Sequence, residues 1–328
     1  MFSRGVFIFL SAICFIHCKQ REAPSEFSKE KLLRQLDQAI EDQPFNDSLY
    51  FLRGNYYYTK SDFKAAQSDL VYAIKLDSLI PEYYHLLADA YLDGGNSFDG
   101  LNTMMRAVIQ FPTRIPTLLK LCEFQNILKQ YDHSLETITM ILKQDPTNAQ
   151  GYLMAGINLR DMKDTANAIK NITTATKYDD HLTDAWIILG QLTQHRDYRL
   201  AGTYFKNALL LDSNDLNTLH AYAMYVQSTE SSSALHLYQK IIDLDPSYSD
   251  AYLNMGILYF RMDSFSRALD HFNILCRQEP TESKYYYYRG TVKEAINDNE
   301  GAKSDFEQAI KLNPAFHEAK SALSHLKK

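Results

Sequence analysis

The chain has 328 residues, with 34 Lys or Arg against 40 Asp or Glu, which gives a formal net charge of −6. An acidic chain without a basic stripe is a poor match for nucleic acid, whose phosphates attract clustered Lys and Arg. We therefore expect no nucleic-acid partner, and the hydrophobic fraction of 45% is enough for a sizeable core.

The first notable segment is residues 6–16 (VFIFLSAICFI), an apolar run interrupted only by Ser11. A helix of that length rises about 16 Å, roughly half of a membrane's hydrocarbon core, so the run is too short to span it. It fits the apolar part of a secretory signal peptide over residues 1–17. A buried structural role for Cys18 is disfavoured, because residues 19–22 are all polar.

A signal segment that ends at a cysteine resembles a bacterial lipoprotein, in which that cysteine is lipidated and becomes the new N-terminus. The CK pair followed by a polar stretch is similar to lipoproteins of the Bacteroidota, although His17 stands where a small residue is usual. The resemblance implies a lipid on Cys18, a tether over residues 18–26, and a place in the cell envelope. Lys19, rather than Asp, follows the cysteine, which favours the outer membrane. Ordinary signal cleavage and an uncleaved anchor are the alternatives.

The rest of the chain repeats about every 34 residues. Glycine follows an aromatic residue by four positions in several places, as Gly256 follows Tyr252. Each unit contains two stretches with apolar residues at three- and four-residue spacing, which predicts two helices. One unit cannot bury its apolar face alone, so neighbouring units must stack. Six prolines mark one phase of the repeat: Pro44, Pro112, Pro146, Pro246, Pro280 and Pro314.

This pattern resembles the tetratricopeptide repeat (TPR) family. The resemblance implies an all-α superhelical solenoid of about eight helix-turn-helix repeats over residues 47–316. Residues 27–46 match a second helix alone, an N-terminal half repeat, and residues 317–328 match a capping helix. The repeats that begin at residues 183 and 216 are one residue short. We expect that loss in the turn between their two helices, where it is tolerated best.

In a TPR superhelix the first helix of each repeat lines a concave groove, and the resemblance assigns the second, fifth, ninth and twelfth residues of each repeat to it. The early groove is acidic, with Glu82, Asp89 and Glu123 around His85. Ordinary solvation is the preferred explanation of that patch.

The later groove is apolar, and exposed apolar surface usually marks a partner site for a helix or an extended peptide. The alternative is that these side chains pack against neighbouring helices. Among the four consecutive tyrosines 285–288, Tyr286 is expected at a packing position and Tyr287 in the groove, with Tyr285 and Tyr288 between these two positions. The predicted partner-binding row is Leu153, Ile157, Ile187, Met224, Leu253, Ile257, Phe260 and Tyr287.

The expected function is that of a non-catalytic scaffold that holds proteins or peptides near a membrane without a cofactor. HExxH, GxSxG, GxxxxGK and CxxC motifs are absent from the sequence. A periplasmic or outer-membrane module that captures peptides or glycans is the second class, since aromatic side chains could stack on sugars. The candidates are Tyr58, Phe260, Tyr287 and, least favoured because it occupies a packing position, Trp186. A metal-dependent enzyme in the acidic groove is a remote third. The sequence does not indicate the oligomeric state.

Overall fold

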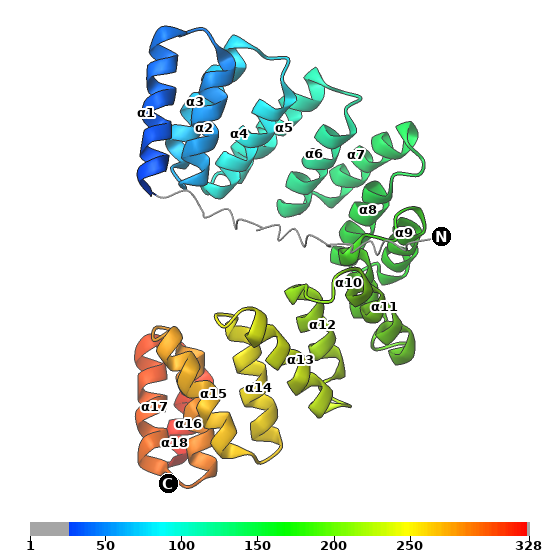
Figure 1. The fold of residues 1–328 in the computed structure, drawn as a ribbon. Coiled ribbons are helices and arrows are strands. Elements are labelled where there is room, and N and C mark those ends of the chain that lie inside the picture. The colour runs from blue at the N-terminus through cyan, green and yellow to red at the C-terminus, as the bar shows by residue number, and fades with distance from the viewer. Residues whose placement is uncertain (1–25, 327–328) are drawn as a thin grey trace, which may run out of the picture. The chain divides into compact units, whose positions relative to one another are not determined.

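The computed structural model describes residues 26–326, and its regular elements there are all α-helices (Figure 1). This confirms the predicted all-α fold of TPR type. Within the described part of the chain, no helix is both long and apolar enough to cross a bilayer. The signal segment, Cys18 and most of the tether lie outside the described residues.

Sixteen of the described helices form eight consecutive pairs, preceded by α1 (Glu26–Asp42) and followed by α18 (His317–Leu326). The first helices of the pairs are α2 (Asp47–Thr59), α4 (Pro81–Asp93), α6 (Ile115–Ile127), α8 (Ala149–Asp161), α10 (Thr183–Thr193), α12 (Leu216–Val226), α14 (Ser249–Arg261) and α16 (Ser283–Ala295). The second helices are α3 (Phe63–Leu76), α5 (Ser97–Gln110), α7 (Tyr131–Gln144), α9 (Thr165–Tyr178), α11 (Tyr198–Leu211), α13 (Ser231–Leu244), α15 (Phe265–Gln278) and α17 (Asn299–Leu312).

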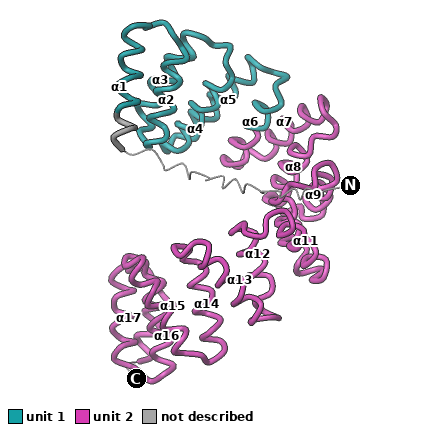
Figure 2. Tube along the Cα trace, in the orientation of Figure 1, with its two compact units in different colours: residues 1–120 teal, residues 121–328 magenta. Residues whose placement is uncertain are grey.

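The chain divides into two compact units, Met1–Lys120 and Leu121–Lys328, with the boundary inside α6 (Figure 2). In the first unit α2 packs on α3, and α3 packs on α4. In the second unit, from α8 to α17, each helix packs on the next one along the chain. Each unit therefore buries its apolar faces by stacking helices that are close in sequence, as repeat proteins do.

Close contact between paired helices depends on small residues opposite large ones. Ala201 on α11 is fully buried, and Phe205, one turn later, fills the space beside α10. A Cβ at Gly190 of α10 would come within 2.7 Å of Phe205 Cζ, so glycine is needed for the ring to fit. The α14–α15 pair repeats this arrangement, because a Cβ at Gly256 would lie 2.7 Å from Phe272 Cε1.

The turns inside the pairs explain the two short repeats. Six of these turns contain one residue with positive φ, a conformation that costs about 1–2 kcal/mol for residues other than glycine. In the turns that follow α10 and α12, Gln194 and Gln227 have φ of −55° and −60°, and no residue described there has positive φ. The omitted residue is therefore the left-handed one. The six left-handed residues are Ser61, Gly95, Lys129, Lys163, Asp263 and Asn297.

Arg289 and the buried Asp305 form a bidentate ion pair, here called an arginine fork, which joins the two helices of the last pair. Arg289 on α16 donates to both carboxylate oxygens of Asp305 on α17, at 2.6 and 2.9 Å. Lys293 lies 2.8 Å from the same carboxylate, and Asn273 Oδ1 on α15 accepts a third hydrogen bond from Arg289 at 3.1 Å. Asp305 is only 3% exposed, so its charge depends on these partners.

The first unit contains a matching fork. Arg53 on α2 donates to both oxygens of Asp69 on α3, at 2.7 and 2.8 Å. Its third hydrogen bond, at 2.8 Å, goes to Asp37 on α1. The two forks differ in that third partner, which is a carboxylate in the first unit and a neutral amide in the second.

The two described cysteines, Cys122 and Cys276, are buried and form no disulfide. Burial raises the pKa of the Cys122 thiol to about 12 and that of Cys276 to about 11. Both side chains therefore act as small apolar core residues.

Candidate functional site

The first helices α10, α12, α14 and α16 of the second unit are neighbours and share one face, the first-helix face. α10 contacts α12, and α14 contacts α16. Between these pairs, Asn254 Nδ2 on α14 donates to His220 Nε2 on α12 at 3.1 Å. The face carries two pockets, one on each side of this link.

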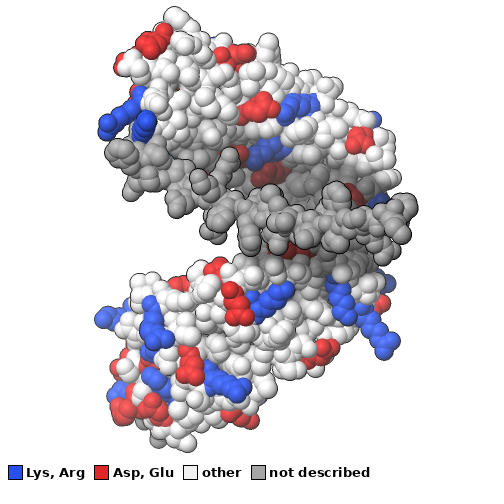
Figure 3. Space-filling view, in the orientation of Figure 1, with Lys and Arg blue, Asp and Glu red and all other residues white. Residues whose placement is uncertain are grey.

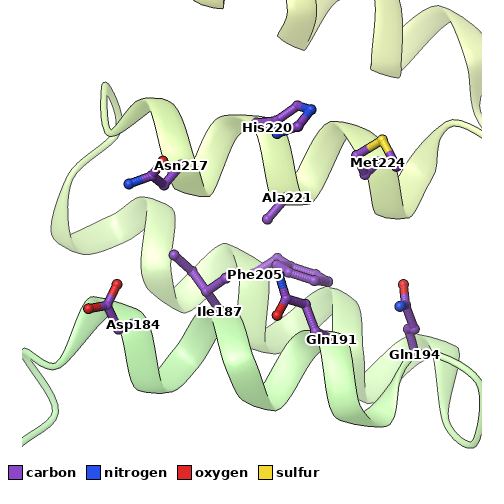
Figure 4. A pocket seen from close by; sticks show the side chains of 9 residues that line it. All are labelled: Asp184, Ile187, Gln191, Gln194, Phe205, Asn217, His220, Ala221 and Met224. Atoms are coloured by element: carbon purple, nitrogen blue, oxygen red, sulfur yellow. The ribbon is translucent and has the colours of Figure 1, made fainter. Parts of the chain in front are cut away.

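The larger pocket lies between α10 and α12, with a volume of about 570 Å³, and is named the amide pocket (Figure 4). Figure 4 shows Ile187, Gln191 and Gln194 directed from α10 toward α12, with Phe205 between the two helices. The full lining is Asp184, Ile187, Gln191 and Gln194 from α10, Phe205 from α11, and Asn217, His220, Ala221 and Met224 from α12.

Three amide side chains give this pocket its chemistry. Gln191 and Asn217 are exposed and Gln194 is half-buried. Each amide offers a hydrogen-bond donor and an acceptor, and residues 26–326 supply a hydrogen-bond partner to none of the three. A peptide main chain presents the complementary groups at every residue. The pocket is therefore suited to an extended main chain of almost any sequence.

His220, which lines the same pocket, connects α12 to α14 and is not placed as a reactive group. Burial lowers the pKa of this imidazole below its usual value, with Asp250 opposing the shift in part. The neutral ring accepts from Asn254 and meets the Tyr248 ring edge-on at 5.7 Å. It thereby joins α12 to α14 and aligns the two halves of the face.

The smaller pocket lies between α14 and α16, with a volume of about 180 Å³, and is named the aromatic slot. Phe272 and Val292 are buried and close its floor, and Tyr288 stacks on Phe272 with ring centroids 5.7 Å apart. The hydroxyl of Thr291 donates to the Tyr287 carbonyl at 2.9 Å and is thereby satisfied. The full lining is Ile257, Phe260, Arg261, Phe272, Tyr287, Tyr288, Thr291 and Val292.

Arg261 is the charged group of the slot. It is the last residue of α14 and is exposed. No ion pair joins it to any residue between 26 and 326. Its guanidinium is therefore available to an anion that approaches the slot.

The predicted apolar row is divided between the pockets and the core. Ile187 and Met224 line the amide pocket, and Ile257, Phe260 and Tyr287 line the aromatic slot. The others lie elsewhere on the first helices, where Leu153 is buried, Ile157 is half-buried and Leu253 packs half-buried against the core. The assignment of the row to partner binding stays a prediction.

Tyr287 has a double role. Its ring lines the slot and also packs against Phe306 at 6.0 Å and Phe316 at 5.1 Å between centroids. A large change at this residue will therefore disturb the α16–α17 packing as well as the pocket.

The predicted acidic patch is partnered inside the first unit. Glu82 pairs with Arg114 at 2.7 Å, and Asp89 pairs with Lys120 at 2.7 Å. His85 Nε2 lies 3.0 Å from the Thr117 hydroxyl, and burial lowers the pKa of that imidazole.

Glu123, the fourth predicted member of the patch, is exposed and belongs to the second unit. On the side shown in Figure 3, Lys and Arg are interspersed with Asp and Glu on both units. Such mixing is typical of an ordinary solvated surface.

Within residues 26–326, potential metal ligands gather at Asp179, Asp180 and His181, whose ligand atoms lie within 4.8 Å of one another. These are consecutive residues before α10, and two of them are exposed. Exposed acidic groups often lie this close without an ion, so the cluster carries no assignment.

Comparison with known proteins gives matches to two family models, each described as "Tetratricopeptide repeat", the first over residues 237–270 and the second over residues 283–316. The second match covers the α16–α17 pair. The chain is 24% identical over 206 residues to "Tetratricopeptide repeat protein 16" of Macaca fascicularis, which covers 56% of this chain and 23% of that protein. The chain thus spans about a quarter of the curated relative.

Two solved structures have a similar fold. One is "Crystal structure of APC/C hetero-tetramer Cut9-Hcn1", with a TM-score of 0.58, 15% identity, and coverage of 92% of this chain and 60% of that one. The other is a tetratricopeptide repeat protein from Parabacteroides merdae, with a TM-score of 0.54, 18% identity, and coverage of 76% and 99%. The two matched segments show that residues 237–270 and 283–316 are tetratricopeptide repeats, and the helix pairs of the described residues have the tetratricopeptide repeat fold.

Proposed function

We propose that the protein is a non-catalytic scaffold that binds protein partners or peptides on the first-helix face of its second unit. A lipid on Cys18 would hold it in the cell envelope, at the outer membrane. TPR proteins generally serve as interaction scaffolds. The observation that carries the proposal is the presence of an apolar slot and a pocket of unengaged amides on one face.

Physical chemistry favours a polypeptide as the ligand of this face. The slot offers apolar contact, which contributes roughly 25 cal/mol per Å² removed from water. The amide pocket offers side-chain donors and acceptors, the kinds of group that pair with a main chain. A polypeptide supplies apolar side chains and a regular main chain together, and groove binding of such segments is a common recognition mode.

The membrane part of the proposal is supported by the sequence alone. The apolar run of residues 6–16 ends just before Cys18, and a charged stretch follows it. A lipid at Cys18 would leave the folded repeats in water.

Capture from native membranes tests both parts of the proposal. Tagged full-length protein and its Cys18→Ser variant would be crosslinked in cells, and their partners identified from membrane and soluble fractions. We expect a defined partner in the membrane fraction that the variant no longer recovers there. An unchanged partner list from the soluble fraction would remove the anchor from the proposal.

A matched pair of variants tests the face itself. Met224 lines the amide pocket and is 45% exposed, whereas Met140 on α7 is 41% exposed and lines neither pocket. Both can accept a charge without entering the core. We expect Met224→Glu to lose the captured partner and Met140→Glu to retain it, with equal helix content by circular dichroism. Retention by both variants would show that the partner binds elsewhere.

A further inference from the structure

We infer that the partner segment carries a bulky apolar side chain beside an acidic residue, the first entering the aromatic slot and the second pairing with Arg261. This inference rests on the proposed function, since it names the partner's chemistry for the same face. It also places the main-chain contacts of the partner about six residues from the apolar anchor.

The size of the slot identifies the anchor. A volume of about 180 Å³ is below the roughly 300–1,000 Å³ of pockets that take small molecules. It suits one side chain. Ile257, Phe260 and Tyr287 are half-buried, so their apolar surface is still partly in water. A Leu, Met or Phe side chain covers such surface best.

A polar anchor is disfavoured for a separate reason. The Thr291 hydroxyl already donates to the carbonyl of Tyr287, and the floor residues Phe272 and Val292 have no polar side-chain atoms. A buried amide or carboxylate in the slot would lose its water without gaining matching hydrogen bonds, which costs free energy.

Arg261 supplies the second specificity element. Its planar guanidinium can hold a carboxylate through two parallel hydrogen bonds. It lies at the C-terminal end of α14, where the helix dipole favours a positive charge. Because no described residue forms an ion pair with it, an incoming carboxylate does not have to displace an internal one.

The charge at the opposite end of the face fixes where the acidic residue goes. Asp184 is exposed and lines the amide pocket. A partner carboxylate there would meet a like charge, whereas beside the slot it meets Arg261. The acidic residue of the partner therefore belongs next to the apolar anchor.

Helix spacing sets the distance between anchor and main-chain contacts. Packed helices lie about 8–10 Å apart, and the two pockets are separated by two first-helix steps, from α10–α12 to α14–α16. That separation is roughly 20 Å, which an extended chain covers in about six residues at about 3.3–3.6 Å each. The amides of the amide pocket would then bind main chain at that distance from the anchor.

Labelled synthetic peptides test the inference on the full chain. Twelve-residue peptides in a Gly-Ser background would carry Phe followed by Asp, Phe followed by Lys, or Ala followed by Asp. Fluorescence anisotropy would give their affinities. We expect the Phe-Asp peptide to bind at least tenfold more tightly than Ala-Asp, and about fivefold more tightly than Phe-Lys. An Arg261→Glu variant should reverse the order of the two Phe peptides.

Matched controls separate recognition from folding. Arg277 on α15 is exposed and outside the slot, so Arg277→Glu should keep the preference for Phe-Asp. Thr291→Phe should fill the slot and abolish binding, while Thr203→Phe on α11 should not. These two threonines are comparable, because each hydroxyl donates to the carbonyl four residues earlier.

Three results would overturn the inference. They are the absence of binding by every peptide, equal affinity for Phe-Asp and Ala-Asp, and an unchanged order in Arg261→Glu. The proposed function is tested separately by membrane capture with Met224→Glu. If Met224→Glu loses its natural partner but none of the peptides binds, the face binds proteins and the inferred pair of an apolar and an acidic residue is wrong.

Discussion

Polar side chains on the first helices behave differently in the two units. In the first unit Glu82 and Asp89 are paired with Arg114 and Lys120, each at 2.7 Å. In the second unit the three amides of the amide pocket have no hydrogen-bond partner among the described residues. The charged residues of the first unit are therefore less available to a ligand than the neutral amides of the second unit. A charged groove position thus reveals little about ligand binding until its internal partners are known.

Aromatic residues show the same contrast. In the first unit the Tyr58 hydroxyl donates to Asp93 at 2.5 Å, which raises the pKa of Tyr58 to about 12. In the second unit Tyr288 stacks on Phe272 and lines a pocket. Tyr58 of the first unit thus links two helices through a hydrogen bond, whereas Tyr288 of the second unit forms part of a pocket surface.

The largest expected effect concerns the two arginine forks. Asp305→Ala leaves the half-buried Arg289 and Lys293 without their buried carboxylate, and breaking such a pair typically costs about 3–5 kcal/mol. Asp69→Ala should cost less, because Arg53 keeps its hydrogen bond to Asp37. Urea unfolding followed by circular dichroism measures both. Asp243→Ala, at an exposed position, is the control. Equal losses for Asp305→Ala and Asp69→Ala would remove the distinction between the forks.

A smaller effect is expected from pH. Burial lowers the pKa of His85 in the first unit and of His220 and His271 in the second. Below the ordinary histidine pKa of about 6.5, the unfolded chain binds protons that the folded chain resists. The free energy of unfolding should therefore fall as pH drops from 7 through that value toward the lowered pKa values.

Denaturant titrations at several pH values measure this slope. His220→Gln should reduce it, because one buried imidazole is removed, whereas His181→Gln should not, because His181 is exposed. A slope that is identical in both variants would mean that His220 does not contribute.

The smallest effect is expected at the exposed pair of the first unit. Glu82→Gln should change the free energy of unfolding by less than about 0.5 kcal/mol, since exposed ion pairs contribute little. It should leave peptide affinity unchanged in the anisotropy assay. A marked loss of affinity would show that the first unit takes part in binding after all.

Much of the fold could be predicted because it depends on residues that recur with one period. Seven of the nine residues that line the amide pocket occupy the second, fifth, ninth or twelfth place of their repeat, with Phe205 and Ala221 as the exceptions. Equivalent places in the first helices have similar surroundings from repeat to repeat. Once the start of one repeat is fixed, the groove positions of the other repeats follow from it.

The environment of individual aromatic residues was harder to predict. Tyr285, expected between the packing and groove positions, is only 2% exposed and belongs to the core. A signal existed, since the third residue of other repeats is also buried, as with Ala185, Thr218 and Ala251. Those three residues are small, although Tyr83, the third residue of the repeat that begins at residue 81, is also a buried tyrosine.

Hydrogen-bond partners could not be predicted from periodicity. Arg53 and Asp69 are 16 residues apart, as are Arg289 and Asp305, yet the other repeats do not carry this pair. Whether a groove amide or carboxylate meets an internal partner depends on side-chain geometry between neighbouring repeats. The position of the site along the chain could therefore be predicted from the sequence. Which of its side chains are free of internal partners could be seen only in the structure.

The burial of Cys122 and Cys276 has a practical consequence for spectroscopy. Their raised pKa values keep both thiols protonated at neutral pH, and thiolate is the form that reacts with maleimide and methanethiosulfonate reagents. Neither of these two core cysteines needs to be removed before labelling, whereas Cys14 and Cys18, outside the described residues, would be replaced by serine. A single Met262→Cys substitution beside Arg261 would accept a fluorophore or spin label and report occupancy of the aromatic slot in real time.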